Sequence, residues 1–299
     1  MSKMSTIPKF ILNNGIEIPS LGFGTFRIQN SETIELAIKS AISSGYRLID
    51  SAIGYRNEAM IGKTINGLIQ DSSLGLKRED FFITSKLPPS HQGYDNCRRE
   101  FLSSLARFNM DYLDLFLIHW PGTQKLQLSD PRNVENRKGS WKALEELYKE
   151  GKIRAIGVSN YTQKHLLELL SYCTVTPTVL QFELHPLLYQ KDLIDLCKQN
   201  NIQVQAYSSL GGGELVNGKM KIPIIDQIAQ NHKVIPSQIL LRWGYQHEAI
   251  VIPKSIRPEK IKENINIFQF ELTEEEMESL NSLSNLYPKR FCWDPTDVI

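Results

Sequence analysis

No run of about 18 consecutive apolar residues occurs in this chain of 299 residues, which excludes a transmembrane helix of ordinary length. The first ten residues, MSKMSTIPKF, contain no apolar segment long enough for a secretory signal peptide. Neither sign of charge is in clear excess, because the formal net charge is only +1. Neither a nucleic acid nor an anionic membrane is therefore expected as a partner, and the protein is predicted to be cytoplasmic.

Cysteine is scarce, and the spacing of the few cysteines is informative. None forms a C-x-x-C pair or has the spacing to a histidine that a zinc site requires, since the four lie far apart at Cys97, Cys173, Cys197 and Cys292. We therefore expect free thiols in a reducing compartment and no metal site.

A dinucleotide fingerprint and an interdomain linker are also missing. The segment GFGTFR at 22–27 lacks the third glycine of G-x-G-x-x-G, and no long helix pattern begins there, which argues against a Rossmann fold. No Pro-, Gly- or Ser-rich linker divides the chain. The length alone would suit two domains, but α/β barrels of this size are routinely one. We therefore predict a single domain over residues 1–299.

Apolar segments are present in a regular order, and 41% hydrophobic residues provide material for a large core. The first, at 10–18, has Asn-Gly between two short apolar runs, which predicts a β-hairpin lying over one end of the core. Further short apolar runs predict eight strands, at 21–24, 47–50, 81–86, 114–119, 153–158, 178–183, 202–207 and 249–253.

Segments with helical periodicity alternate with these strands. One begins at Ser31, others are predicted near 57–70, 94–108, 140–150, 162–170, 190–199, 258–265 and 273–283, and more than one helical stretch is predicted near 223–247. Thr273 and Glu276 form a capping box that begins the last of them. Because parallel strands need such crossovers, the pattern predicts an α/β fold, a (β/α)8 TIM barrel with an N-terminal hairpin and an extra C-terminal helix and tail. Residues 122–139 and 211–221 are predicted as loops.

Polar residues gather at the carboxyl ends of the predicted strands, where the active sites of such barrels lie. Asp50, Lys86 and His119 end three successive strands, and Tyr55 follows Asp50 by five residues. Each has an ordinary structural explanation by itself: a turn cap, a solvated lysine, a hydrogen-bonded core histidine and a half-buried aromatic ring. Four titratable groups at three successive strand ends favour a catalytic site instead.

Three longer segments resemble the signature regions of the aldo-keto reductases. They are GYRLIDSAIGYRNEA at 45–59, MDYLDLFLIHWP at 110–121 and IPKSIRPEKIKEN at 252–264, and shorter matches in family order are SKL, GKIRAIGVSN, QFELHP and AYSSLG. The resemblance covers nearly the whole chain. It implies a (β/α)8 barrel that reduces aldehydes and ketones with NADPH and without a metal, and a catalytic tetrad of Asp50, Tyr55, Lys86 and His119.

The chemistry of carbonyl reduction suits these side chains. Hydride addition leaves negative charge on the carbonyl oxygen, which a proton donor stabilises, and Tyr55 is the candidate acid. A free phenol has a pKa of about 10, so we expect the Lys86 ammonium to lower the pKa of Tyr55 and Asp50 to hold that ammonium. His119 is expected to hydrogen-bond the carbonyl oxygen as a neutral imidazole.

The resemblance also implies a site for NADPH or NADP+. Tyr207 matches the aromatic platform under the nicotinamide ring, and Ser159, Asn160 and Gln181 match the residues that bind its carboxamide. The full set of cofactor-binding candidates is Gly24, Thr25, Asp50, Ser159, Asn160, Gln181, Tyr207, Ser208, Leu210, Lys254, Ser255, Lys260, Glu263 and Asn264.

Basic residues near the last strand bear on the choice between NADPH and NADH. Lys254 and Ser255 stand where the family holds the 2′-phosphate, and Arg257 and Lys260 add positive charge nearby. This cluster favours the phosphorylated cofactor, although it also suits a solvated helix start. Many relatives carry arginine in place of Lys260, and the loss of its planar fork keeps NADH possible.

Aromatic residues predict an apolar pocket for the carbonyl compound. The substrate-binding candidates are Phe26, Tyr55, His119, Trp120 and Trp293, of which Trp293 is equally compatible with packing. The tail FCWDPTDVI is short after Trp293, so the long C-terminal arm of steroid-converting relatives, and bulky steroids as main substrates, are not expected.

Two classes of function stay open. The first is an NADPH-dependent reductase of small carbonyl compounds that acts as a monomer, with an NAD-preferring alcohol dehydrogenase as its variant. The second is a non-catalytic NADPH-binding regulatory subunit on the same barrel, as in the potassium-channel β subunits of the family. Turnover of NADPH with a broad panel of carbonyl compounds discriminates between the two classes.

Overall fold

The computed structural model describes residues 7–299, so the expectation that no signal peptide is present concerns residues that lie partly outside it. None of the helices in the described part of the chain is both long enough and apolar enough to cross a bilayer. All four cysteines are unpaired thiols. Residues 7–299 contain no cluster of three or more histidine, cysteine, aspartate or glutamate side chains placed to hold a metal ion.

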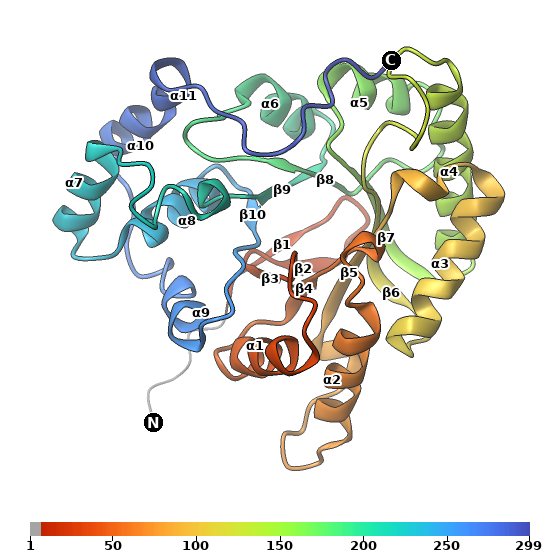
Figure 1. The fold of residues 1–299 in the computed structure, drawn as a ribbon, viewed down its shortest axis with the longest axis horizontal. Coiled ribbons are helices and arrows are strands. Elements are labelled where there is room, and N and C mark those ends of the chain that lie inside the picture. Colours follow the sequence, from red (N-terminus) through yellow and green to blue (C-terminus); the bar gives the residue numbers. More distant parts are fainter. Residues whose placement is uncertain (1–6) are drawn as a thin grey trace.

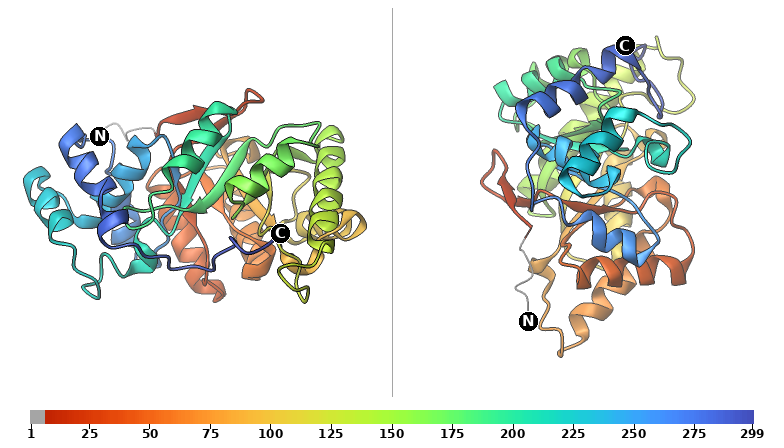
Figure 2. Two further views of the ribbon diagram at one scale, coloured as in Figure 1. Left: turned by 90° about the horizontal axis from the view of Figure 1, so that it is seen from above. Right: turned by 90° about the vertical axis from the view of Figure 1, so that its left-hand side faces the viewer.

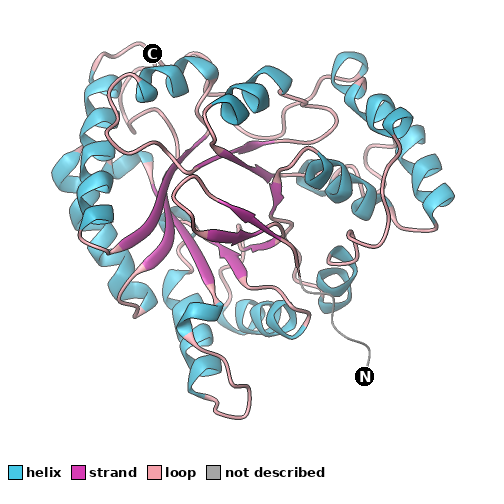
Figure 3. Cartoon of the chain, turned by 180° about the vertical axis from the view of Figure 1, so that it is seen from behind, coloured by secondary structure: helices cyan, strands magenta, loops and turns pink. Residues whose placement is uncertain are grey.

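Eight parallel strands form one sheet whose spatial order follows the chain. Leu21 bridges Val251, and Gly24 N donates to Pro253 O, so the first and last strands meet and the sheet closes into a barrel. Figure 3 shows the strands at the centre with helices around them, which confirms the predicted (β/α)8 architecture. The strands are β3 (Gly22–Gly24), β4 (Leu48–Asp50), β5 (Phe82–Leu87), β6 (Leu113–Ile118), β7 (Ile153–Ser159), β8 (Val179–Glu183), β9 (Gln203–Tyr207) and β10 (Ile250–Val251).

The predicted hairpin is confirmed as an antiparallel pair, β1 (Lys9–Ile11) and β2 (Glu17–Pro19). Leu12 and Ile18 from this hairpin are buried against Leu48 inside the barrel. The hairpin therefore covers the end of the barrel where the strands begin. The left view of Figure 2 places it on the opposite side of the barrel from the C-terminal tail.

Helices surround the barrel, as the periodicity predicts (Figure 1). They are α1 (Ser31–Ser43), α2 (Glu58–Gln70), α3 (Tyr94–Phe108), α4 (Arg132–Lys149), α5 (Gln163–Leu170), α6 (Lys191–Gln199), α7 (Pro223–His232), α8 (Pro236–Gln246), α9 (Pro258–Asn264), α10 (Glu274–Asn281) and α11 (Leu283–Leu286). Short 3-10 turns are η1 (Ile53–Tyr55), η2 (Arg78–Asp80), η3 (Pro89–His91) and η4 (Gly211–Gly213). The Thr273 capping box that begins α10 is confirmed.

One helix boundary was predicted wrongly. The sequence predicts a helix near 140–150 and a loop at 122–139, but α4 begins at Arg132. Its first turns bury polar side chains, Asn133 and Arg137, in place of apolar ones. Asn133 Nδ2 donates to Gln127 O and Leu128 O of the preceding loop. Because these buried residues are polar, the hydrophobic periodicity gives no sign of the first two turns.

The inside of the barrel changes from apolar to polar along the strands. Leu48 and Val179 belong to the apolar cluster of the interior. Asp50 and Gln181 follow two positions later on the same strands, and therefore project to the same inner face. The polar side chains are thus concentrated at the carboxyl ends of the strands, opposite the hairpin.

Candidate active site

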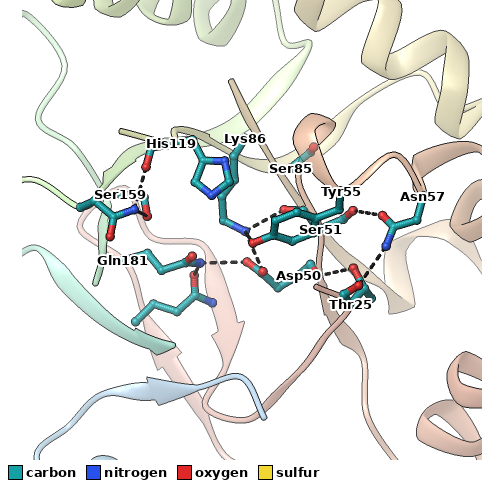
Figure 4. A network of polar contacts seen from close by, with 12 residues as sticks. Thr25, Asp50, Ser51, Tyr55, Asn57, Ser85, Lys86, His119, Ser159 and Gln181 are labelled. Atoms are coloured by element: carbon teal, nitrogen blue, oxygen red, sulfur yellow. Dashed lines mark hydrogen bonds and ion pairs between the residues drawn. The ribbon is translucent and has the colours of Figure 1, made fainter. Parts of the chain in front are cut away.

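A buried lysine lies at the centre of the polar cluster (Figure 4). Lys86 of β5 is fully buried, and its Nζ lies 2.7 Å from Asp50 Oδ1, 2.7 Å from Ser51 O and 3.5 Å from Tyr55 Oη. A lysine ammonium has three N–H donors, so each has an acceptor. Burial lowers the pKa of Lys86, while the Asp50 carboxylate opposes this effect. The sequence prediction that Asp50 holds the ammonium agrees with this geometry.

Tyr55 lies on η1, in the loop between β4 and α2, and a buried asparagine fixes this loop. Asn57 Oδ1 accepts a hydrogen bond of 2.7 Å from Ser51 Oγ, and Asn57 Nδ2 donates to Thr25 O at 3.0 Å and to Ile28 O at 3.1 Å. The loop is therefore tied to the end of β4 and to the loop after β3. Asn57 was not predicted as a site residue, although it lies within the matched segment at 45–59.

The expected direction of the Tyr55 pKa shift is wrong. Burial of the phenol raises the pKa of Tyr55 well above its ordinary value, and the nearby Asp50 carboxylate raises it further. The Lys86 ammonium is 3.5 Å away, at the outer limit of a hydrogen bond, and does not outweigh these effects. Tyr55 is therefore a protonated phenol at neutral pH.

His119 follows β6 and faces the tyrosine. The centroids of the Tyr55 and His119 rings lie 5.8 Å apart. Burial, and then the positive charge of Lys86, lower the pKa of His119 well below its ordinary value. The imidazole is thus neutral at neutral pH, as expected from the sequence. Asn160 Nδ2 donates to His119 O at 2.8 Å and so ties this strand end to the next one.

Aromatic rings form a wall beside the tetrad. Phe26 lies 5.0 Å from the Tyr55 ring, Trp120 stacks 6.1 Å from His119, and Trp293 meets Trp120 edge-on at 4.9 Å, all between ring centroids. Phe26 is 51% exposed and Trp293 is 46% exposed. The substrate-binding candidates therefore lie together and present apolar surface at the barrel mouth.

The tail that carries Trp293 is fixed at its start by a buried carboxylate. Glu183, at the end of β8, accepts hydrogen bonds from Phe291 N at 2.7 Å and from Cys292 N at 3.0 Å. His185 Nε2 lies 2.9 Å from the same carboxylate. The tail is thus fastened through its backbone amides by Glu183, a residue that was not among the predicted site residues.

The tail is fixed a second time near its end. His165 Nε2 lies 2.8 Å from Val298 O, and Arg137 Nη1 lies 2.7 Å from Ile299 O. The same Arg137 nitrogen donates to Pro121 O at 3.1 Å, next to Trp120. One buried guanidinium therefore contacts both the segment that carries Trp120 and the tail that carries Trp293.

Acid is expected to weaken this second attachment. Burial is the main cause that lowers the pKa of His165, from 6.5 to about 4. Between pH 4 and pH 6.5, His165 is therefore mostly protonated in the unfolded chain and mostly neutral in the folded chain. The free energy of unfolding should fall as the pH drops from about 6.5 to about 4, by at most about 1.4 kcal/mol per pH unit.

Urea unfolding at several pH values measures this effect. His165→Gln, whose amide can still donate to Val298 O, should flatten the pH dependence between pH 4 and 6.5. His91→Gln, at a partly exposed histidine, is the matched control. An identical pH slope in wild type and His165→Gln would contradict the assignment.

Several cofactor-binding candidates lie beside the tetrad. Gln181 Nε2 donates to Asp50 Oδ2 at 2.8 Å, so this amide contacts the tetrad directly (Figure 4). Tyr207 Oη donates to Asn160 Oδ1 at 2.6 Å, and Asn160 Nδ2 donates to Ser159 Oγ at 3.1 Å. Asn160 has a φ of 61°, so the chain turns sharply where these side chains meet.

The other candidates on the first and seventh barrel strands have structural contacts. A Cβ on Gly24 would lie 2.7 Å from Ile252 O, so glycine is required where the barrel closes. Thr25 Oγ1 donates to Asp50 O at 2.9 Å. Ser208 Oγ lies 3.5 Å from Cys292 Sγ of the tail, and Leu210 is partly buried.

The remaining candidates form a second group after β10. Lys254 and Ser255 lie in the loop, while Lys260, Glu263 and Asn264 lie on α9. Lys260 Nζ makes an ion pair of 2.6 Å with Glu263 Oε2, and Asn264 is buried. Within residues 7–299 Lys254 makes no ion pair of its own, in contrast to Lys260.

Arg27 adds a cation that was not among the predicted site residues. Burial, and then the positive charge of Arg27, lower the pKa of Lys254, so the two cations repel one another. Arg27 has a φ of 61°, and its guanidinium lies 5.0 Å from the centre of the Phe26 ring. Two cations held together without a carboxylate partner in the described residues fit an anionic phosphate group.

The fold and the site together define a (β/α)8 barrel with a polar cluster at the carboxyl ends of its strands. A family model described as the aldo/keto reductase family matches residues 20–285. The chain therefore belongs to the aldo-keto reductase family, whose named relatives are reductases and dehydrogenases.

Two curated relatives and one solved structure illustrate this membership. Glyoxal reductase of Bacillus subtilis (strain 168) is 44% identical over 273 residues, which cover 91% of each chain. Morphine 6-dehydrogenase of Pseudomonas putida is 39% identical and covers 97% of this chain and 95% of its own. The Bombyx mori aldo-keto reductase solved in complex with NADP has a TM-score of 0.85 and 29% identity, with 96% of this chain and 95% of that chain covered.

Proposed function

We propose that this protein reduces aldehydes and ketones to alcohols with NADPH, and that Tyr55 is the general acid. The observation that carries the proposal is the contact of Tyr55 Oη with Lys86 Nζ at 3.5 Å, next to an ion pair of 2.7 Å between Lys86 and Asp50. A phenol, a buried ammonium and a neutral imidazole thus surround one space at the barrel mouth. Such a set can stabilise negative charge on a carbonyl oxygen.

The residues present fit the cofactor. Two cations, Arg27 and Lys254, suit its phosphate groups, and Gln181 and Ser159 suit a carboxamide beside the tetrad. Tyr207 offers an aromatic ring, held by Asn160. When bound, NADPH supplies the hydride that the carbonyl carbon receives.

The side chains of the tetrad stabilise the negative charge on the substrate oxygen and supply the proton that it takes up. Because Tyr55 Oη accepts from the Lys86 ammonium, its own proton is available to the substrate oxygen. His119 donates an N–H to the same oxygen and orients it. An alkoxide is a stronger base than a phenolate, so the proton transfer is favourable even though burial raises the pKa of Tyr55. The phenolate that results lies beside the positive charge of Lys86.

The direct test is turnover. Purified protein, NADPH and a panel of aldehydes, ketones and 1,2-dicarbonyl compounds are mixed, and the absorbance of NADPH is followed. Consumption of NADPH with formation of the alcohol supports the proposal. Tight NADPH binding with no turnover across the panel would favour the regulatory-subunit alternative instead.

Replacing Lys254 should separate NADPH from NADH. Lys254→Met is expected to raise KM for NADPH by about 10- to 100-fold, the effect of losing a charged hydrogen bond, and to change KM for NADH by less than about 3-fold. Lys262→Met, which removes an exposed lysine of α9, is the matched control. Equal losses with both cofactors would show that Lys254 does not bind the 2′-phosphate.

We also propose that residues 1–299 act as one domain and as a monomer in the cytoplasm. The continuous ring of strands supports the first point, and the free thiols of all four cysteines support a reducing compartment. Light scattering coupled to size-exclusion chromatography tests the monomer, because a particle mass near twice the 34.2 kDa of the chain would contradict it.

A further inference from the structure

A glutamine that has no assigned role lies beneath the tetrad. Gln205 of β9 is fully buried, and its Oε1 accepts a hydrogen bond of 2.7 Å from Gln181 Nε2. The same Gln181 nitrogen donates to Asp50 Oδ2 at 2.8 Å. Gln205, Gln181 and Asp50 therefore form a continuous chain of hydrogen bonds that leads to Lys86 and Tyr55.

The direction of these hydrogen bonds is fixed by the carboxylate. An ionised Asp50 can only accept, so Gln181 must turn its NH₂ group toward it. The atom of Gln205 that contacts this NH₂ group must then be an acceptor, which is its carbonyl oxygen. Both N–H groups of Gln181 are thereby used within the protein.

The oxygen of Gln181 is left for a ligand. Within residues 7–299 no hydrogen bond is formed to Gln181 Oε1, and this atom is not one of the buried atoms without a partner. It is therefore accessible to a ligand, on a side chain whose neighbour on β7 in the sheet register is Ser159. An amide oxygen in this position can only accept a hydrogen bond.

Gln205 is not explained by packing. Its own Nε2 is buried and has no partner in the described residues, which costs free energy. Its neighbours in the sheet register are Gln181 on β8 and the apolar Ile250 on β10. An apolar side chain would fill this position without leaving this donor unpaired, but it would offer no acceptor to Gln181 Nε2.

We propose that Gln205 is a positioning residue that orients the Gln181 amide, so that the site accepts an N–H from the carboxamide of the nicotinamide ring. The site thereby selects a nicotinamide over an analogue that has no carboxamide N–H. This inference rests on the proposed function, because it takes NADPH or NADP+ as the ligand.

Binding of two oxidised cofactors tests the inference without turnover. NADP+ is compared with 3-acetylpyridine adenine dinucleotide phosphate, in which a methyl ketone replaces the carboxamide, by quenching of tryptophan fluorescence. Wild type should bind NADP+ about 5- to 10-fold more tightly than the analogue, the effect of one hydrogen bond. Gln205→Met, which keeps the shape but accepts no hydrogen bond, should reduce this ratio to about 1- to 2-fold.

Two further variants distinguish positioning from a structural role. Gln205→Glu, whose buried carboxyl is expected to be protonated and to keep an acceptor oxygen for Gln181 Nε2, should restore most of the discrimination. Gln203→Met, on the same strand at the other end of the barrel, should leave the ratio unchanged. Thermal unfolding of each variant establishes that the fold is intact.

The possible results separate the two proposals. A wild-type protein that binds both cofactors equally would overturn the role of Gln205 even if Gln205→Met does not fold. An unchanged ratio in a folded Gln205→Met would overturn it as well. If wild type discriminates as expected but reduces no carbonyl compound, the role of Gln205 stands and the proposed reductase function fails.

Discussion

Tyr55→Phe is expected to lower kcat for carbonyl reduction by about 10²- to 10⁴-fold, the usual contribution of a positioned acid. The substitution removes only the phenolic hydroxyl, and the Lys86–Asp50 ion pair stays in place. The Kd for NADPH should therefore change by less than about 2-fold, since the phenol is assigned to the substrate and not to the cofactor. Steady-state kinetics and fluorescence quenching measure the two quantities separately.

A matched control and a pH profile sharpen this test. Tyr94→Phe removes a phenolic hydroxyl that contacts Glu146 on the outer surface, and should leave kcat unchanged. Because burial raises the pKa of Tyr55, its proton is retained through neutral and mildly alkaline pH. Reduction should therefore show no loss of activity from this group below about pH 10. Retention of a tenth or more of kcat in Tyr55→Phe would exclude the assigned acid.

Lys86→Met is expected to abolish turnover and to lower the free energy of unfolding by about 3–5 kcal/mol. The substitution leaves the Asp50 carboxylate buried without its cation, and this uncompensated charge is the source of the cost. Asp50→Asn combined with Lys86→Met removes both charges, so the double variant should be more stable than Lys86→Met alone. Urea unfolding followed by circular dichroism measures both values.

An exposed ion pair provides the control for charge loss. Lys39→Met breaks the surface pair of Lys39 with Glu35 on α1, where both side chains are about half exposed. The expected loss there is below about 1 kcal/mol. A similar small loss for Lys86→Met would show that the buried pair does not hold the strand ends together.

The fold could be predicted from the sequence because the apolar pattern follows the strands and helices closely. The first two turns of α4 were not predicted, because Asn133 and Arg137 occupy the buried positions that apolar residues normally fill. The helical stretches predicted near 223–247 are α7 and α8, which are separated at Lys233, where φ is 56°.

The proximity of the four tetrad candidates could be predicted from the sequence because they end or follow neighbouring strands, but their electrostatics could not. Lys86 and Tyr55 were predicted to be close because their strands are consecutive. The rise in the pKa of the phenol depends on its burial, which follows only from the three-dimensional structure. The position of Gln205 could not be predicted for a related reason. In β9, polar Gln203 and Gln205 alternate with apolar Val204 and Ala206, a pattern that ordinarily places the polar residues on a solvated face. Here the face that carries Gln205 lines the interior of the barrel.

The fastening of the C-terminal segment by Glu183 does not involve the side chain of Trp293. Glu183 accepts from the main-chain amides of Phe291 and Cys292, so exchanging Trp293 would alter the shape of the opening without breaking either hydrogen bond. Cys292 is less free to vary, because its thiol lies 3.5 Å from Ser208 Oγ. Position 293 is therefore suited to directed diversification, which would change the aromatic wall while the attachment of the segment stays intact.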